Sequence, residues 1–163
     1  MSAAPQEVVT FRLGDDRFAA DVAAVERVLR YVKPTVLPNL PDWLDGVIEY
    51  QRRVIPAIDL RVRFGLERRE PRPESRIILF ATADEWIGAI VDAVLEVVAI
   101  PAEEIATPPK VFRGLKAEYL RGLIRRDDGL VIFLNVPHLL SSSERVELKR
   151  ARGAQAGGEG GAA

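Results

Sequence analysis

The chain of 163 residues has no cysteine, one histidine, and no apolar run near the roughly 20 residues that a membrane-spanning helix needs. The lack of cysteine excludes disulfides, a thiol nucleophile and cysteine-ligated zinc. The formal net charge is -1, so no overall positive field favours nucleic acid or anionic lipid. The N-terminal residues lack the basic and apolar regions of a signal peptide. We therefore expect a cytoplasmic protein without direct membrane insertion.

Residues that could carry catalysis are equally scarce. His138 lies in the apolar run 136–140, where a structural histidine is more common than a catalytic base. The serines at 141–143 fit a helix cap, and no serine has a Gly-x-Ser-x-Gly context. With one histidine, a transition-metal site would need clustered carboxylates, and the sequence does not cluster them. We expect no enzyme, no catalytic residue, no cofactor and no metal.

What the chain does contain is short, alternating, β-branched segments separated by turn residues, which predict a mainly β protein. The expected strands are Val8–Leu13, Arg17–Asp21, Glu26–Tyr31, Gly46–Tyr50, Val54–Asp59, Arg76–Thr82, Trp86–Val91, Asp92–Ile100, Leu120–Arg125 and Leu130–Leu134. A helical turn is expected at Val22–Val25 and a short helix at Pro41–Leu44, and the Ser-x-x-Glu pattern from Ser141 predicts a terminal helix to about Arg150. The charged segment Glu67–Ser75 predicts a linker or crossover, and residues 1–6 and 151–163 are expected to be disordered tails.

The strongest pattern is an internal repeat, in which apolar, turn and glycine positions agree between the two halves of the chain. The matched segments are Val8–Phe11 with Ile77–Phe80, Val25 and Val28 with Val94 and Val97, and Gly46–Ile48 with Gly122–Ile124. A five-strand set of this length closes into a small barrel, which removes exposed edges. We predict one domain over 7–150 with two SH3-like five-stranded β-barrels side by side. The first barrel would span about 17–75 and the second about 76–134, with the N-terminal strand and the C-terminal helix crossing.

Arginine is locally in excess, with eight arginines against four acidic residues between Arg52 and Arg76. This excess fits a solvated face with a linker, a protein-docking surface, or RNA binding by a small barrel. The last reading is weakened because no set of aromatic residues for base stacking lies beside the arginines. The repeated valines also allow two readings, since they are either core residues or a paired apolar patch that receives an amphipathic helix.

Five segments together resemble the signature of one family, although any one alone would be weak. They are FRLGDDRFAADVAAVERV from Phe11, LPNLPDWLDGVI from Leu37, VIPAIDLRVRFG from Val54, WIGAIVDAVLEVV from Trp86 and EYLRGLIRRDDGLVIFLNVPHLL from Glu118. The chain thereby resembles the CheW family of bacterial chemotaxis coupling proteins over roughly Val8–Leu140, and it resembles the stand-alone adaptor.

The resemblance implies two SH3-like barrels and a non-catalytic adaptor. Such an adaptor couples the cytoplasmic tip of a chemoreceptor (a methyl-accepting chemotaxis protein) to the regulatory domain of a CheA-type histidine kinase in receptor arrays. The groove between the barrels is implied to bind the receptor, through Val25, Val28, Gly46, Gly88, Val94 and Val97. A loop is implied to bind the kinase, through Arg27, Glu49, Gln51, Arg52, Arg53 and Val54.

The chain departs from the family in this loop. Where the family usually shows Asn-Leu-Arg-Gly, this chain has Glu49-Tyr50-Gln51-Arg52. The position of the family arginine is therefore Gln51, and the position of the turn glycine is Arg52. An acidic residue is also common at the position of Arg27. The departure leads to two hypotheses, an adaptor tuned to its own receptor and kinase, or one that binds the receptor but not the kinase and modulates array composition.

Overall fold

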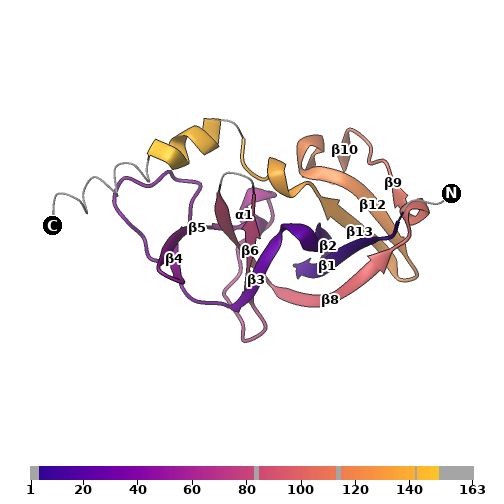
Figure 1. Ribbon diagram of the computed structural model, residues 1–163, viewed down its shortest axis with the longest axis horizontal. Coiled ribbons are helices and arrows are strands. Elements are labelled where there is room, and N and C mark those ends of the chain that lie inside the picture. The colour runs from indigo at the N-terminus through magenta and orange to yellow at the C-terminus, as the bar shows by residue number, and fades with distance from the viewer. Residues whose placement is uncertain (1–3, 83–84, 113–114, 142, 151–163) are drawn as a thin grey trace.

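The computed structural model describes residues 4–82, 85–112, 115–141 and 143–150, and its strands form three sheets (Figure 1). Sheet A has the order β8-β1-β2-β13-β12-β9, sheet B has the order β3-β6-β7-β5-β4, and β10 pairs with β11 in a small third sheet. The strands are β1 (Gln6–Leu13), β2 (Asp16–Asp21), β3 (Val25–Arg30), β4 (Gly46–Tyr50), β5 (Arg53–Asp59), β6 (Arg76–Ala81), β7 (Trp86–Val91), β8 (Ala93–Ile100), β9 (Ile105–Ala106), β10 (Val111–Phe112), β11 (Leu115–Lys116), β12 (Leu120–Arg126) and β13 (Gly129–Leu134).

Helical segments are short. They are η1 (Val22–Ala24), α1 (Leu60–Arg63), η2 (Ala102–Glu104), η3 (Ala117–Tyr119), η4 (Val136–His138) and the helical residues 143–150. The mainly β fold with few short helices is confirmed, and sheets A and B are consistent with two SH3-like units. In the part of the chain that the structure describes, no helix is long and apolar enough to cross a membrane.

Sheets A and B have the same strand order once the repeat is considered. Strands β1 to β5 of the first repeat correspond to β6, β7, β8, β12 and β13 of the second. Sheet A contains the β1–β2 hairpin of the first repeat with β8, β13 and β12 of the second, and sheet B contains the reciprocal set. Strand β9 is an additional strand at the edge of sheet A. In each sheet one parallel pairing, β2 with β13 or β7 with β5, joins the two repeats. The chain is therefore not divided near residue 75, and the expected bounds of 17–75 and 76–134 are corrected by this exchange of hairpins.

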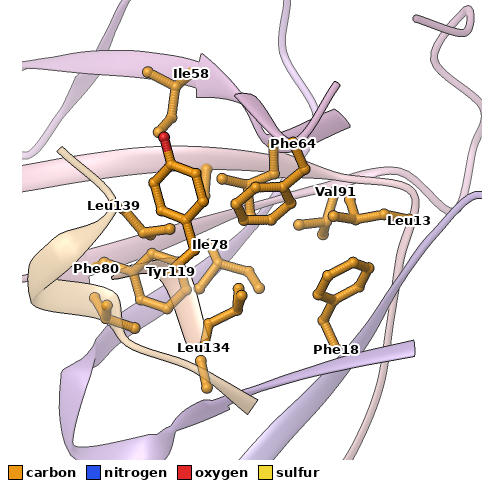
Figure 2. Packing of buried hydrophobic residues seen from close by; sticks show 14 of the residues in the cluster. Leu13, Phe18, Ile58, Phe64, Ile78, Phe80, Val91, Tyr119, Leu134 and Leu139 are labelled. Carbon is orange, nitrogen blue, oxygen red and sulfur yellow. The ribbon is translucent and has the colours of Figure 1, made fainter. Parts of the chain in front are cut away.

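The largest hydrophobic cluster lies between the two sheets and contains residues from both (Figure 2). Phe18 belongs to this cluster, with its ring centroid 5.9 Å from that of Phe11 and 5.6 Å from that of Phe64. Two smaller clusters fill the opposite faces of the sheets, one around Phe133 in sheet A and one around Ile77 in sheet B. Both faces of each sheet are thus covered by apolar side chains, and the shared cluster joins the two sheets into one folding unit.

Most of the expected strands are confirmed with small changes in their bounds, but three expectations were wrong or incomplete. Pro41–Leu44 forms no helix, because its single turn, in which the Leu44 N–H donates to the Pro41 carbonyl, is followed by the extended strand β4. Gln6 is not in a disordered tail, since it pairs with Ile100 in the sheet. The short strands β9, β10 and β11 were not expected. The expected tail at 151–163 lies outside the described residues.

The helix at 143–150 begins with the capping box that the sequence predicts. The Glu144 N–H donates to Ser141 Oγ at 3.2 Å, and the Ser141 N–H donates to Glu144 Oε1 at 2.9 Å. Arg63 of α1 donates to Glu144 Oε2 at 2.7 Å, and the indole N–H of Trp43 donates to Glu147. The helix, drawn in yellow in Figure 1, therefore follows a strand of sheet A but contacts segments next to sheet B.

Replacing Glu144 with glutamine should make stability less dependent on pH in the acidic range. Burial raises the pKa of Glu144, but the hydrogen bonds from Arg63 and Ser141 outweigh it and leave the pKa below its ordinary value of 4.5. A lowered pKa in the folded state stabilises the protein above the unfolded pKa, and this stabilisation is lost as pH falls through the folded pKa. Urea unfolding should show Glu144→Gln less stable by about 1 kcal/mol at neutral pH. If the stability difference between the wild type and Glu144→Gln were as large well below pH 4.5 as at neutral pH, the lowered pKa of Glu144 would not be its cause.

Candidate functional site

In the expected groove, Val25 and Val28 share one face of β3, and Val94 and Val97 share one face of β8, because each strand contains a β-bulge. In β3 the register shifts between Val25, which pairs with Phe80, and Arg27, so that Val28 pairs with Ile78. In β8 the equivalent shift places Val94 opposite Phe11 and Val97 opposite Val9. A strand alternates its side chains, so residues three apart share a face only when an extra residue intervenes. The extra residues are Glu26 and Leu95, at equivalent positions of the repeat.

These faces of β3 and β8 adjoin the hydrophobic cluster between the two sheets. The cross-strand partners Phe80, Ile78, Phe11 and Val9 all belong to that cluster, and Val25 and Val94 pack against it. Val28 and Val97 extend beyond the cluster and are 38% and 65% exposed. We call these four residues the valine face. Exposed valines anchored beside a rigid core are suited to contact an apolar partner surface.

The two glycines implied for the groove have other roles in the structure. Gly46 has φ +150°, and a Cβ there would lie 2.5 Å from the carbonyl oxygen of Thr35. A Cβ at Gly88 would point at Ile77 and Ile48, which belong to the cluster on the other face of sheet B. Both glycines permit close packing within the sheet-B unit, so they are not part of the valine face.

The divergent loop is a two-residue hairpin turn between β4 and β5. Tyr50 pairs with Arg53, and the two residues between them, Gln51 and Arg52, have φ values of +47° and +64°. Positive φ at both central positions is the feature of a type I′ turn, which normally contains asparagine and glycine. A residue with a side chain costs about 1–2 kcal/mol in this conformation. The backbone of the turn is thus retained without glycine, at the expense of strain.

The other implied loop residues divide between the two faces of sheet B. Arg53 lies over the ring of Trp86, with its Cζ 4.2 Å from the ring centroid, and Arg27 lies 5.8 Å from the centroid of Tyr50. The rings of Tyr50 and Trp86 are themselves 6.3 Å apart. These four side chains belong to the face that carries the smaller sheet-B cluster. Glu49 and Val54 form an exposed cross-strand pair on the opposite face.

Many of the neighbouring arginines are neutralised by carboxylates. Arg61 is buried, with Nη1 3.1 Å from Asp92 and Nη2 donating to the Arg69 carbonyl at 2.6 Å. Arg63 contacts Glu144, and Arg68 contacts Asp45 at 3.1 Å. These three arginines therefore hold the segment after β5 in place. Among the described residues, by contrast, no carboxylate pairs with Arg27, Arg52 or Arg53.

A cavity of about 570 Å³ opens between the ends of β2 and β6, η4 and the helix at 143–150. Ala23 and Ala24 line it, directly before Val25, together with Arg121 and Arg145. Arg121 contacts Asp21 at its edge, at 3.4 Å. Across residues 4–82, 85–112, 115–141 and 143–150, no group of three or more histidine, aspartate or glutamate residues is placed to hold a metal ion.

The sequence analysis named the four valines and the loop residues, but it did not predict the aromatic rings beside Arg27 and Arg53. Tyr50 and Trp86 are far apart in the chain, and only the pairing of β5 with β7 brings them together. A signal was present in Trp86, an aromatic residue at the start of a strand, which the repeat aligns with Arg17 in the other half.

Comparison with known proteins agrees with this geometry. Residues 7–144 match the CheW-like domain. The chain is 30% identical to the chemotaxis protein CheW of Treponema pallidum, over 87% of this chain and 86% of that protein. It is 32% identical to protein FrzA of Myxococcus xanthus, over 89% and 91%. The crystal structure of the scaffolding protein TtCheW from Thermoanaerobacter tengcongensis superposes with a TM-score of 0.78 at 32% identity, covering 85% of this chain and 90% of that one.

The domain match covers both large sheets and both halves of the repeat. The structural similarity covers 85% of this chain, so the overall fold is common to the relative and this chain. The chain therefore belongs to the CheW family, whose members are non-catalytic scaffold proteins of chemotaxis.

Proposed function

We propose that this chain couples a chemoreceptor to a CheA-type histidine kinase in bacterial chemosensory signalling, acting in the cytoplasm at receptor arrays. The observation that carries the proposal is the valine face, in which a bulge at equivalent positions of two repeats presents Val28 and Val97 beside a rigid core. An apolar face of this kind can receive one side of an amphipathic helix. The cytoplasmic tip of a receptor, a helical hairpin, would supply that helix.

The kinase would dock at the end of sheet B that carries the β4–β5 turn. This location is supported by exposed side chains on both sides of the turn, Arg27 and Arg53 on one face and Val54 on the other. The receptor would contact β3 and β8, and the kinase would contact the end of sheet B with the turn, so that one molecule would hold both partners at once. Signalling would then be a shift between conformational populations of the complex, transmitted through contacts without chemistry in this chain.

Reconstitution tests the proposal directly. The purified chain, the full-length CheA-type kinase of the same organism and a receptor cytoplasmic fragment would be combined, and kinase autophosphorylation measured. We expect receptor control of the kinase only when the chain is present. Binding of neither partner, measured for each one separately, would refute the proposal.

A second candidate is an adaptor that binds the receptor but not the kinase. The observation that favours it is the substitution of the turn residues, since Gln51 and Arg52 stand where the family usually has arginine and glycine. On this hypothesis the wild-type chain would show no kinase binding, and the double variant Gln51→Arg, Arg52→Gly would gain it. Titration calorimetry with the kinase separates the two candidates. A double variant that binds no better than the wild type would count against this candidate.

A further inference from the structure

We propose that Arg52, with Arg27 and Arg53, selects a kinase whose docking face carries carboxylates, and that the strained turn is retained for the charge of Arg52. This inference rests on the proposed kinase docking and names the chemistry of the partner. It starts from the three arginines at one end of sheet B that no described carboxylate neutralises. The neighbouring Arg61, Arg63 and Arg68 are each paired with an acid, so pairing is available in this region.

The register places Arg53 at the end of the sheet that carries the turn, and the contact of Arg27 with the ring of Tyr50 brings Arg27 beside it. Arg53 begins β5, Trp86 begins the parallel strand β7, and Tyr50 ends β4. Stacking of Arg53 on Trp86 at 4.2 Å and of Arg27 near Tyr50 at 5.8 Å restricts both guanidinium groups before any partner arrives. An arginine that is already ordered loses less conformational freedom when it pairs with a carboxylate. The cluster is thus organised to receive negative charge.

The turn supplies an independent argument. Arg52 has φ +64°, a conformation that glycine adopts without strain. The equivalent hairpin of the second repeat, between β12 and β13, has its positive φ at Gly129 instead. Strained backbone conformations persist where a side chain is used. Because Arg52 makes no described contact with an acid of its own chain, its charge remains available to a partner.

The test compares two glycine variants that relieve the same turn. Arg52→Gly should raise the melting temperature by about 2–4 °C and weaken kinase binding about fivefold. Gln51→Gly should raise the melting temperature similarly and leave the affinity within about twofold, because it removes no charge. Arg52→Glu should weaken binding on the order of tenfold or more, and it should also reduce the dependence of the affinity on salt.

Arg125→Glu is the matched charge control, since Arg125 is an exposed arginine on β12 in sheet A. If Arg52→Gly and Arg52→Glu bind the kinase as tightly as the wild type does, the inference is overturned and the proposed coupling function remains intact. Absence of any wild-type binding to the kinase would overturn both. Self-association of the chain that Arg52→Glu abolishes, with kinase binding unaffected, would also overturn the inference, because the arginines would then serve contact between copies.

Discussion

Replacing Phe18 with alanine is expected to lower the free energy of unfolding by about 3–5 kcal/mol. Phe18 is fully buried and stacks between Phe11 and Phe64, so its removal leaves a cavity that rigid neighbours fill poorly. Phe18 also lies on β2, the strand that pairs with β13 across the two repeats. The loss should therefore destabilise both sheets together.

Urea unfolding followed by circular dichroism and by tryptophan fluorescence measures this effect. Both probes should report one transition with the same midpoint, because the shared cluster couples the sheets. Phe18→Leu should retain most of the buried volume and lose about 1–1.5 kcal/mol, which keeps the test informative if the alanine variant does not fold. Val62→Ala, at a residue 44% exposed, is the surface control and should change stability by less than about 0.5 kcal/mol. Two separate transitions in the wild type would contradict a single folding unit.

The sequence predicted the local elements well because their signals are local. Alternating apolar residues and turn residues located the strands of both repeats, and Ser141 with Glu144 located the last helix. The exchange of hairpins could not be read in the same way. Strands β2 and β7 carry the same pattern as each other, so either could pair with β5 or β13. Only the packing of the shared cluster decides between these pairings.

The site was predicted in part for a similar reason. The spacing of three between Val25 and Val28, and between Val94 and Val97, gave the repeated apolar positions, but a strand without a bulge would place them on opposite faces. The bulges follow from register, which the sequence pattern does not specify. The glycine positions were assigned to the groove by resemblance, whereas backbone geometry assigns Gly46 and Gly88 to packing within the sheet-B unit.

The variant Val97→Glu is expected to weaken receptor binding on the order of a hundredfold or more, if the receptor docks on the valine face as proposed. The side chain of Val97 is 65% exposed, so a carboxylate there is solvated in the free protein and should leave the fold intact. In the complex the same carboxylate would be buried against an apolar helix without a partner, which costs several kcal/mol. The expected result is a loss of receptor affinity at unchanged melting temperature.

Titration of the receptor fragment against each variant, with kinase binding measured in parallel, distinguishes a loss of receptor binding from a general loss of binding. Val28→Glu should also weaken receptor binding. Because Val28 is only 38% exposed, a carboxylate there is less well solvated in the free protein, and this variant should lose some stability. Val146→Glu is the matched control, since Val146 is 48% exposed and lies on the helix at 143–150, outside β3 and β8. Kinase affinity should remain unchanged in Val97→Glu and Val146→Glu, because neither residue adjoins Arg27, Arg52 or Arg53 in the chain. Equal receptor binding by Val97→Glu and Val146→Glu would place the receptor elsewhere on the molecule.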